Sequence, residues 1–134
     1  MSDSERRRYI RPESLNLLDY IVVDEQGVQS DYSMGRTLNI SIGGILMETH
    51  IKLHAGQQVM ITIGLEDELV DVMGRIVHST PHNDGMYHNG IEFFHASVED
   101  RRIINKYVEA FHSRFPKAIE KKKQALGFLK KNDE

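Results

Sequence analysis

The chain begins with an arginine-rich arm. Four arginines fall within six positions, at Arg6, Arg7, Arg8 and Arg11. A guanidinium group is a planar fork of donors that matches phosphate oxygens and the O6/N7 edge of guanine, which the ammonium group of lysine cannot do. Taken alone, such an arm is typical of a solvated tail, or of a non-specific contact to nucleic acid or an acidic membrane surface. Its chemistry is that of anion binding, and any specificity must come from elsewhere in the chain.

A second polar stretch, which reads NISIGG, follows at the end of a predicted strand. Asn39 and Ser41 are two residues apart, so we expect their side chains to share one face, opposite to that of Ile40. Gly43 and Gly44 allow a turn with positive φ and the close approach of a ligand to the backbone. The stretch therefore predicts a small polar platform, although an ordinary strand–turn–strand connection would have the same sequence.

Length and composition limit the class of protein. A chain of 134 residues with 40% apolar residues is sufficient for one domain with a real core. The net charge of -3 argues against a broad anion-binding surface, so an anion site must be local. The absence of cysteine excludes disulfides and thiolate zinc sites. With no long apolar segment and no signal peptide in view, we expect a soluble, cytoplasmic protein without membrane insertion.

The elements that must position these residues are mainly strands. Short apolar runs alternate with turn-forming separators at 24–27, 55–56 and 81–85, and no helix is expected between them. Gly74 predicts a bulge or a close-packing point. Met34, Leu38 and Ile40 are expected on one side of their strand. Six strands, predicted at 17–23, 32–40, 44–48, 59–63, 70–76 and 87–94, indicate an antiparallel barrel or sandwich.

The pattern changes to helical spacing after Ser97. Ser97 and Asp100 form a capping box, and apolar residues continue at helical intervals to Phe111. We expect this helix to pack on the barrel and close one end of it. Beyond Pro116, residues 117–131 predict a possible second short helix, which would be a frayed solvated helix, a helix docked on its own domain, or a contact in a homodimer.

Together the two polar stretches resemble the hallmark motifs of the PilZ domain family. The arm contains an RRxxxR pattern ending at Arg11, and the later stretch contains NxSxxG. Residues 87–93, YHNGIEF, resemble the last barrel strand of that family, and the helix after Ser97 stands where its helix usually does. The resemblance covers roughly residues 5–115. It implies a six-stranded antiparallel β-barrel with a C-terminal helix at 13–115, a flexible arm at 1–12 and a helical or charged tail at 116–134.

The resemblance implies a non-catalytic bacterial receptor for the second messenger cyclic di-GMP. In this family an arginine at Arg6 tends to accompany an intercalated pair of ligand molecules, so one or two are expected per site. Arg8 is treated as surface charge. Binding would order the arm and change a surface read by an unknown partner in motility, polysaccharide or regulatory machinery. The residues assigned to the ligand are Arg6, Arg7, Arg11, Asn39, Ser41, Gly43 and Gly44.

Three other functions are compatible with parts of the sequence. The pairs His50/His54 and His78/His82 have a spacing that shares a face only on a helix, and they lie in strands or turns, so neither metal nor catalysis is expected. A nucleic-acid module is disfavoured by the acidic net charge and the absence of tryptophan. A PilZ-like protein-interaction module that does not bind nucleotide remains open as the alternative function.

Overall fold

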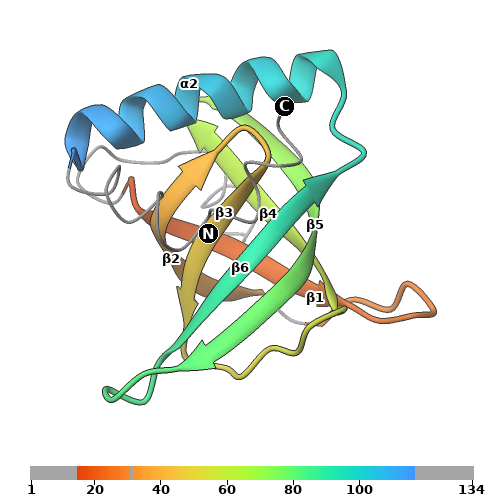
Figure 1. Ribbon diagram of the computed structural model, residues 1–134. Helices are drawn as coiled ribbons and strands as arrows, with labels where there is room; N and C mark the ends of the chain where they lie inside the picture. The colour runs from red at the N-terminus through yellow and green to blue at the C-terminus, as the bar shows by residue number, and fades with distance from the viewer. Residues whose placement is uncertain (1–14, 31, 117–134) are drawn as a thin grey trace, which may run out of the picture.

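A computed structural model describes residues 15–30 and 32–116 of the chain. Six strands form a closed barrel in the order β1-β2-β3-β6-β5-β4, and all neighbouring strands are antiparallel (Figure 1). The fold predicted from the resemblance, a barrel rather than a sandwich, is confirmed. The strands are β1 (Leu17–Val23), β2 (Ser33–Ser41), β3 (Gly44–Thr49), β4 (Gln58–Leu65), β5 (Glu68–Pro81) and β6 (Tyr87–Phe94).

The barrel interior is filled by branched aliphatic side chains, as the period-2 pattern of the strands predicts. Val59, Ile61 and Ile63 of β4 are fully buried in this core. A Cβ atom placed on Gly74 would lie 2.5 Å from Cγ2 of Ile91, so Gly74 is a close-packing point. The irregularity of β5 falls further along the strand, after Ile76.

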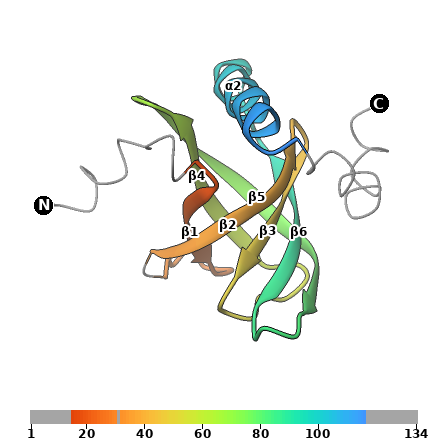
Figure 2. The ribbon, with the colours of Figure 1, turned by 90° about the vertical axis from the view of Figure 1, so that its left-hand side faces the viewer.

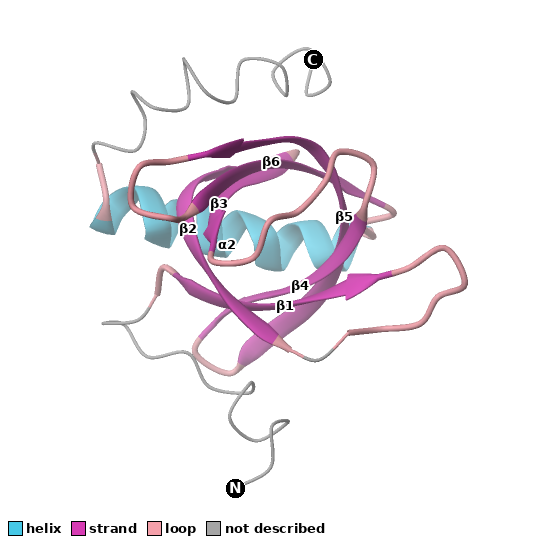
Figure 3. Cartoon of the chain, turned by 90° about the horizontal axis from the view of Figure 1, so that it is seen from below, coloured by secondary structure: helices cyan, strands magenta, loops and turns pink. Residues whose placement is uncertain are grey.

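The helix α2 (Val98–Arg114) begins at the predicted capping box. Ser97 Oγ accepts the backbone N–H of Asp100 at 3.0 Å, and Asp100 Oδ2 accepts the N–H of Ser97 at 3.2 Å. Its buried stripe comprises Ile103, Ile104, Tyr107 and Phe111. The helix crosses one end of the barrel, as Figures 2 and 3 show from two directions. The predicted closing helix is therefore confirmed, while residues 117–131 lie outside the described residues.

Strand β2 contains a β-bulge. Thr37 and Asn39 pair with consecutive residues of β3, so Leu38 is the extra residue. The bulge shifts the alternation of side chains along the strand. Met34 is 54% exposed whereas Ile40 is fully buried. The expectation that Met34, Leu38 and Ile40 share one side is therefore wrong, because simple alternation does not continue across a bulge.

Candidate ligand-binding site

Asn39 and Ser41 share one face of β2 beyond the bulge, as the sequence predicts. Ile40 pairs with Ile45 of β3, and both side chains belong to the barrel core. The side chains on either side of Ile40 therefore belong to the outer wall of the barrel. Asn39 is 0% exposed and Ser41 only 3% exposed. This wall carries a polar platform that is covered rather than open to water.

The side chain of Asn39 is fixed by two donors. Its Oδ1 accepts the backbone N–H of Ile40 at 2.8 Å and lies 2.9 Å from Nε2 of His112 on α2. A backbone N–H can only donate, so the amide atom facing it is the oxygen, and His112 must donate through Nε2. Sequence reasoning missed His112, and the only sequence signal for it is its position directly after Phe111 of the apolar stripe.

The turn that follows is closed by hydrogen bonds of its own. Ser41 Oγ accepts the N–H of Gly43 at 3.3 Å, and the carbonyl of Gly43 accepts the N–H of Phe93 at 2.9 Å. Ser41 pairs with Gly44 across the turn. In residues 15–30 and 32–116, positive φ among glycines occurs at Gly27, Gly56 and Gly85. The positive φ that Gly43 and Gly44 would allow is therefore not used here, and the Ser41 hydroxyl closes the turn instead.

A buried hydroxyl group joins the start of the described chain to β2 and α2. The Tyr107 hydroxyl donates to the carbonyl of Leu15 at 2.7 Å, and it lies 3.0 Å from Thr37 Oγ1. Its single hydrogen is engaged by Leu15, so Thr37 donates to it. Burial raises the pKa of Tyr107 well above its ordinary value, which keeps the hydroxyl protonated. The backbone N–H of Thr37 also donates to the carbonyl of Asn16 at 2.7 Å.

We refer to Leu15, Thr37, Asn39, Tyr107 and His112 as the Tyr107 cluster. It brings together the segment that follows the arginine arm, the motif strand and the helix. Of the predicted ligand residues, Asn39, Ser41, Gly43 and Gly44 lie together at the end of β2 and the start of β3. The other three, Arg6, Arg7 and Arg11, lie outside the described residues, as does Arg8.

A second polar group lies on the other side of the bulge. Glu48 Oε1 accepts from Nε and Nη2 of Arg36 at 3.1 and 2.8 Å, and Oε2 lies 3.0 Å from Nε2 of His88. The ring of His88 stacks on that of His82 with centroids 3.4 Å apart. We call Arg36, Glu48 and His88, which are paired across β2, β3 and β6, the Glu48 row.

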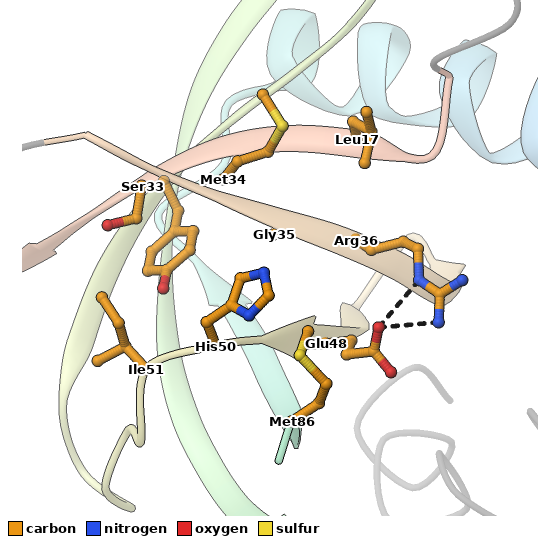
Figure 4. Close-up of a pocket in the computed structure, with 10 residues that line it drawn as sticks. Leu17, Ser33, Met34, Gly35, Arg36, Glu48, His50, Ile51 and Met86 are labelled. Carbon is orange, nitrogen blue, oxygen red and sulfur yellow. Dashed lines mark hydrogen bonds and ion pairs between the residues drawn. The ribbon is translucent and has the colours of Figure 1, made fainter. Parts of the chain in front are cut away.

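Arg36 and Glu48 line a pocket of about 440 Å³ (Figure 4). Mostly apolar residues of β1, β2 and the neighbouring segments complete the wall, and none of the four motif residues contributes to it. The pocket and the motif platform are therefore separate features. The other lining residues are Leu17, Tyr20, Ser33, Met34, Gly35, His50, Ile51 and Met86.

The described residues also bear on the alternatives. Over 15–30 and 32–116, no group of three or more histidine, cysteine or acidic residues could hold a metal ion. Within the same ranges, no helix is long and apolar enough to cross a membrane.

Fold and site together define a small β-barrel domain closed by one helix, with a polar platform on its wall. The sequence matches the PilZ domain family model over residues 5–110, which is most of the chain. The chain therefore belongs to the PilZ domain family, a family of cyclic di-GMP receptors, as the two motifs predicted.

Among solved structures, the chain is similar to that of K. pneumonia MrkH in its apo state. The TM-score is 0.52 at 13% sequence identity, with 76% of this chain and 47% of that chain covered. This chain thus spans about half the length of MrkH, and at this identity the likeness concerns the fold alone. No curated protein sequence gives a significant match.

Proposed function

We propose that this chain is a non-catalytic receptor that binds cyclic di-GMP between its arginine arm and the platform on β2. The observation that carries the proposal is the Tyr107 cluster. It holds Leu15, the first residue of the described chain, next to Thr37, which is two residues before Asn39. Family membership supplies the ligand class, and the geometry supports the conclusion that arm and platform can act on one ligand.

The arm is long enough to reach the platform. Arg11 precedes Leu15 by four residues, so its Cα lies within about 14 Å of that anchor. Thr37 and Asn39 are two residues apart in β2, so at most about 7 Å separates their Cα atoms. The arginine side chain adds further reach. A guanidinium at Arg11 can therefore reach a ligand bound at the end of β2, beside Asn39 and Ser41.

The chemistry of the residues fits the ligand. Cyclic di-GMP carries two phosphates and two guanines, and arginine binds both groups through its donor fork. Asn39 and Ser41 add hydrogen bonds, and Gly43 and Gly44 leave the turn without bulky side chains. Charge-assisted hydrogen bonds contribute about 1.5–3 kcal/mol each, so a few of them support micromolar affinity, or about -8 kcal/mol.

Ligand binding would change the surface of the protein. The two phosphates of cyclic di-GMP would cancel the mutual repulsion of the arginines. They would thereby hold residues 1–12 against the barrel formed by 13–115. The rearranged surface, with or without the tail at 116–134, would be read by a downstream protein in the cytoplasm of a bacterium. Residues 117–131 provide a possible homodimer contact.

Isothermal titration with cyclic di-GMP tests the proposal, with GTP and cyclic GMP as controls. We expect selective binding by the wild-type chain. Arg7→Ala and Arg11→Ala should each weaken it roughly ten- to hundred-fold through the lost charge-assisted contacts, without melting the barrel. Arg8→Ala is the matched control because it removes the same charge outside the motif.

The stoichiometry tests Arg6 separately. Two ligands per chain in the wild type, reduced to one in Arg6→Ala, would support a role of Arg6 in stacking on a second ligand molecule. No heat with any of the three nucleotides would contradict the receptor proposal. It would leave the alternative, a PilZ-like interaction module that does not bind nucleotide.

A further inference from the structure

We propose that His112 is a positioning residue of the ligand site, which makes helix α2 part of that site. His112 donates from Nε2 to Oδ1 of Asn39 at 2.9 Å, although the two residues are 73 positions apart in the chain. The inference rests on the proposed cyclic di-GMP site, because it assigns to His112 the role of orienting one of its contact residues.

The need for positioning follows from the chemistry of an amide side chain. The terminal torsion of asparagine is broad and roughly two-fold, so the oxygen and the amino group exchange places at little cost in shape. A single backbone N–H, that of Ile40 at 2.8 Å, holds Oδ1 on one side. The His112 donor uses the second lone pair of the same oxygen. With His112 protonated at Nε2, two donors on Oδ1 oppose the flipped orientation, which would place the amino group against both N–H groups.

The histidine ring is itself held in place. Phe111 is 2% exposed, and its ring lies edge-on to that of His112 with centroids 5.8 Å apart. His112 lies in the last turn of α2, where the helix dipole favours groups that donate or carry positive charge. The packing of α2 on the barrel therefore fixes the Nε2 donor, and through it the amide of Asn39.

A consequence of this arrangement is that the ligand site depends on a helix that lies outside both motifs. A substitution of His112 should weaken ligand binding although it leaves every ligand contact residue in the sequence unchanged. The expected loss is that of one neutral hydrogen bond, about three- to ten-fold in affinity. The histidine is replaceable in this role by any side chain that presents an N–H donor at the same place.

The test is isothermal titration of cyclic di-GMP into the full chain and its variants, with thermal unfolding as the check on folding. His112→Ala should weaken binding about three- to ten-fold, whereas His112→Gln, which retains a side-chain N–H donor, should restore affinity to about the wild-type value. Val108→Ala is the matched control, because it trims a partly buried residue of the same helix that packs on the core. It should lower the melting temperature and leave affinity unchanged.

A double-mutant cycle with Asn39→Ala separates positioning from a general effect on stability. If His112 acts through Asn39, His112→Ala should cause no further loss of affinity in the Asn39→Ala background. An equal loss in both backgrounds would overturn the inference, as would unchanged affinity in His112→Ala. Binding that is selective in the wild type and sensitive to Arg7→Ala would leave the proposed function standing in either case. No binding by the wild type would overturn both proposals.

Discussion

The two polar groups of β2 differ in what they connect. The Glu48 row is charged and joins neighbouring strands of the barrel wall, at sequence separations of 12 and 40 residues. The Tyr107 cluster consists of two hydrogen bonds between side chains and one from a side chain to a backbone carbonyl, and these join segments 70 to 92 residues apart. The row stabilises a surface that the sheet already defines. The cluster instead connects the segment after the arm, the motif strand and α2, so a ligand at the motif would act on all three.

Of the substitutions that distinguish the two polar groups, Tyr107→Phe is expected to have the largest effect on stability and ligand affinity. The substitution leaves the carbonyl of Leu15 and the hydroxyl of Thr37 without their partner in a buried site. It should lower the free energy of unfolding by about 1–3 kcal/mol, as measured by urea denaturation. Affinity for cyclic di-GMP should also fall, because the anchor next to the arm is loosened.

Tyr20→Phe provides the matched control, since Tyr20 is another buried tyrosine, 1% exposed, that lines the pocket of the Glu48 row. This variant should lose stability while retaining ligand affinity. Equal affinities in the two variants would show that the Tyr107 cluster does not support the ligand site.

A smaller effect is expected from Glu48→Gln. The Glu48 side chain is 8% exposed, but Arg36 is 48% exposed and can be solvated when its partner loses charge. We expect destabilisation by about 1 kcal/mol in thermal or urea unfolding. Cyclic di-GMP affinity should not change, whereas Asn39→Ala should reduce it at least about ten-fold. A loss of affinity in Glu48→Gln would mean that the ligand extends across the bulge to the pocket.

The smallest effect concerns the surface contact between α2 and the β4–β5 turn. Hydrogen bonds from Lys106 and Arg102 lower the pKa of Glu68 to about 2. A lowered pKa means stability that is present above the ordinary value of 4.5 and is lost as the pH falls toward 2.

Thermal unfolding of the wild type and Glu68→Gln should therefore differ at neutral pH and converge at low pH. Because the group is exposed, the difference should be small and should diminish with added salt. A difference that is independent of pH would show that the ion pairs do not contribute to docking of the helix.

Much of the fold could be predicted from the sequence because its signals are local. Strand periodicity in β4 and the capping box at Ser97 depend on residues within a few positions of each other. The bulge at Leu38 could not be predicted, since it is defined by pairing with β3. The prediction that Asn39 and Ser41 share one face was nevertheless correct, because both residues lie beyond the bulge, where side chains alternate regularly again.

The candidate site also contains residues that could be predicted from the sequence and residues that could not. The motifs identified the family and placed Asn39 and Ser41 on the wall of the barrel. They could not indicate His112 or Tyr107, whose contacts arise only when α2 crosses the end of the barrel. They also could not indicate that the Ser41 hydroxyl closes the turn at Gly43 without a left-handed residue.

The hydrogen bond between Tyr107 and Leu15 affects the affinity of the proposed receptor through the geometry of its arm. It fixes the point from which the arm extends, and only residues 12–14 separate that point from Arg11. Once a ligand is bound at the platform, its contact with the arginines would be an intramolecular step. The short tether gives the arginines an effective concentration in the millimolar range. Affinity would therefore depend on the length of this tether as well as on the ligand contacts themselves.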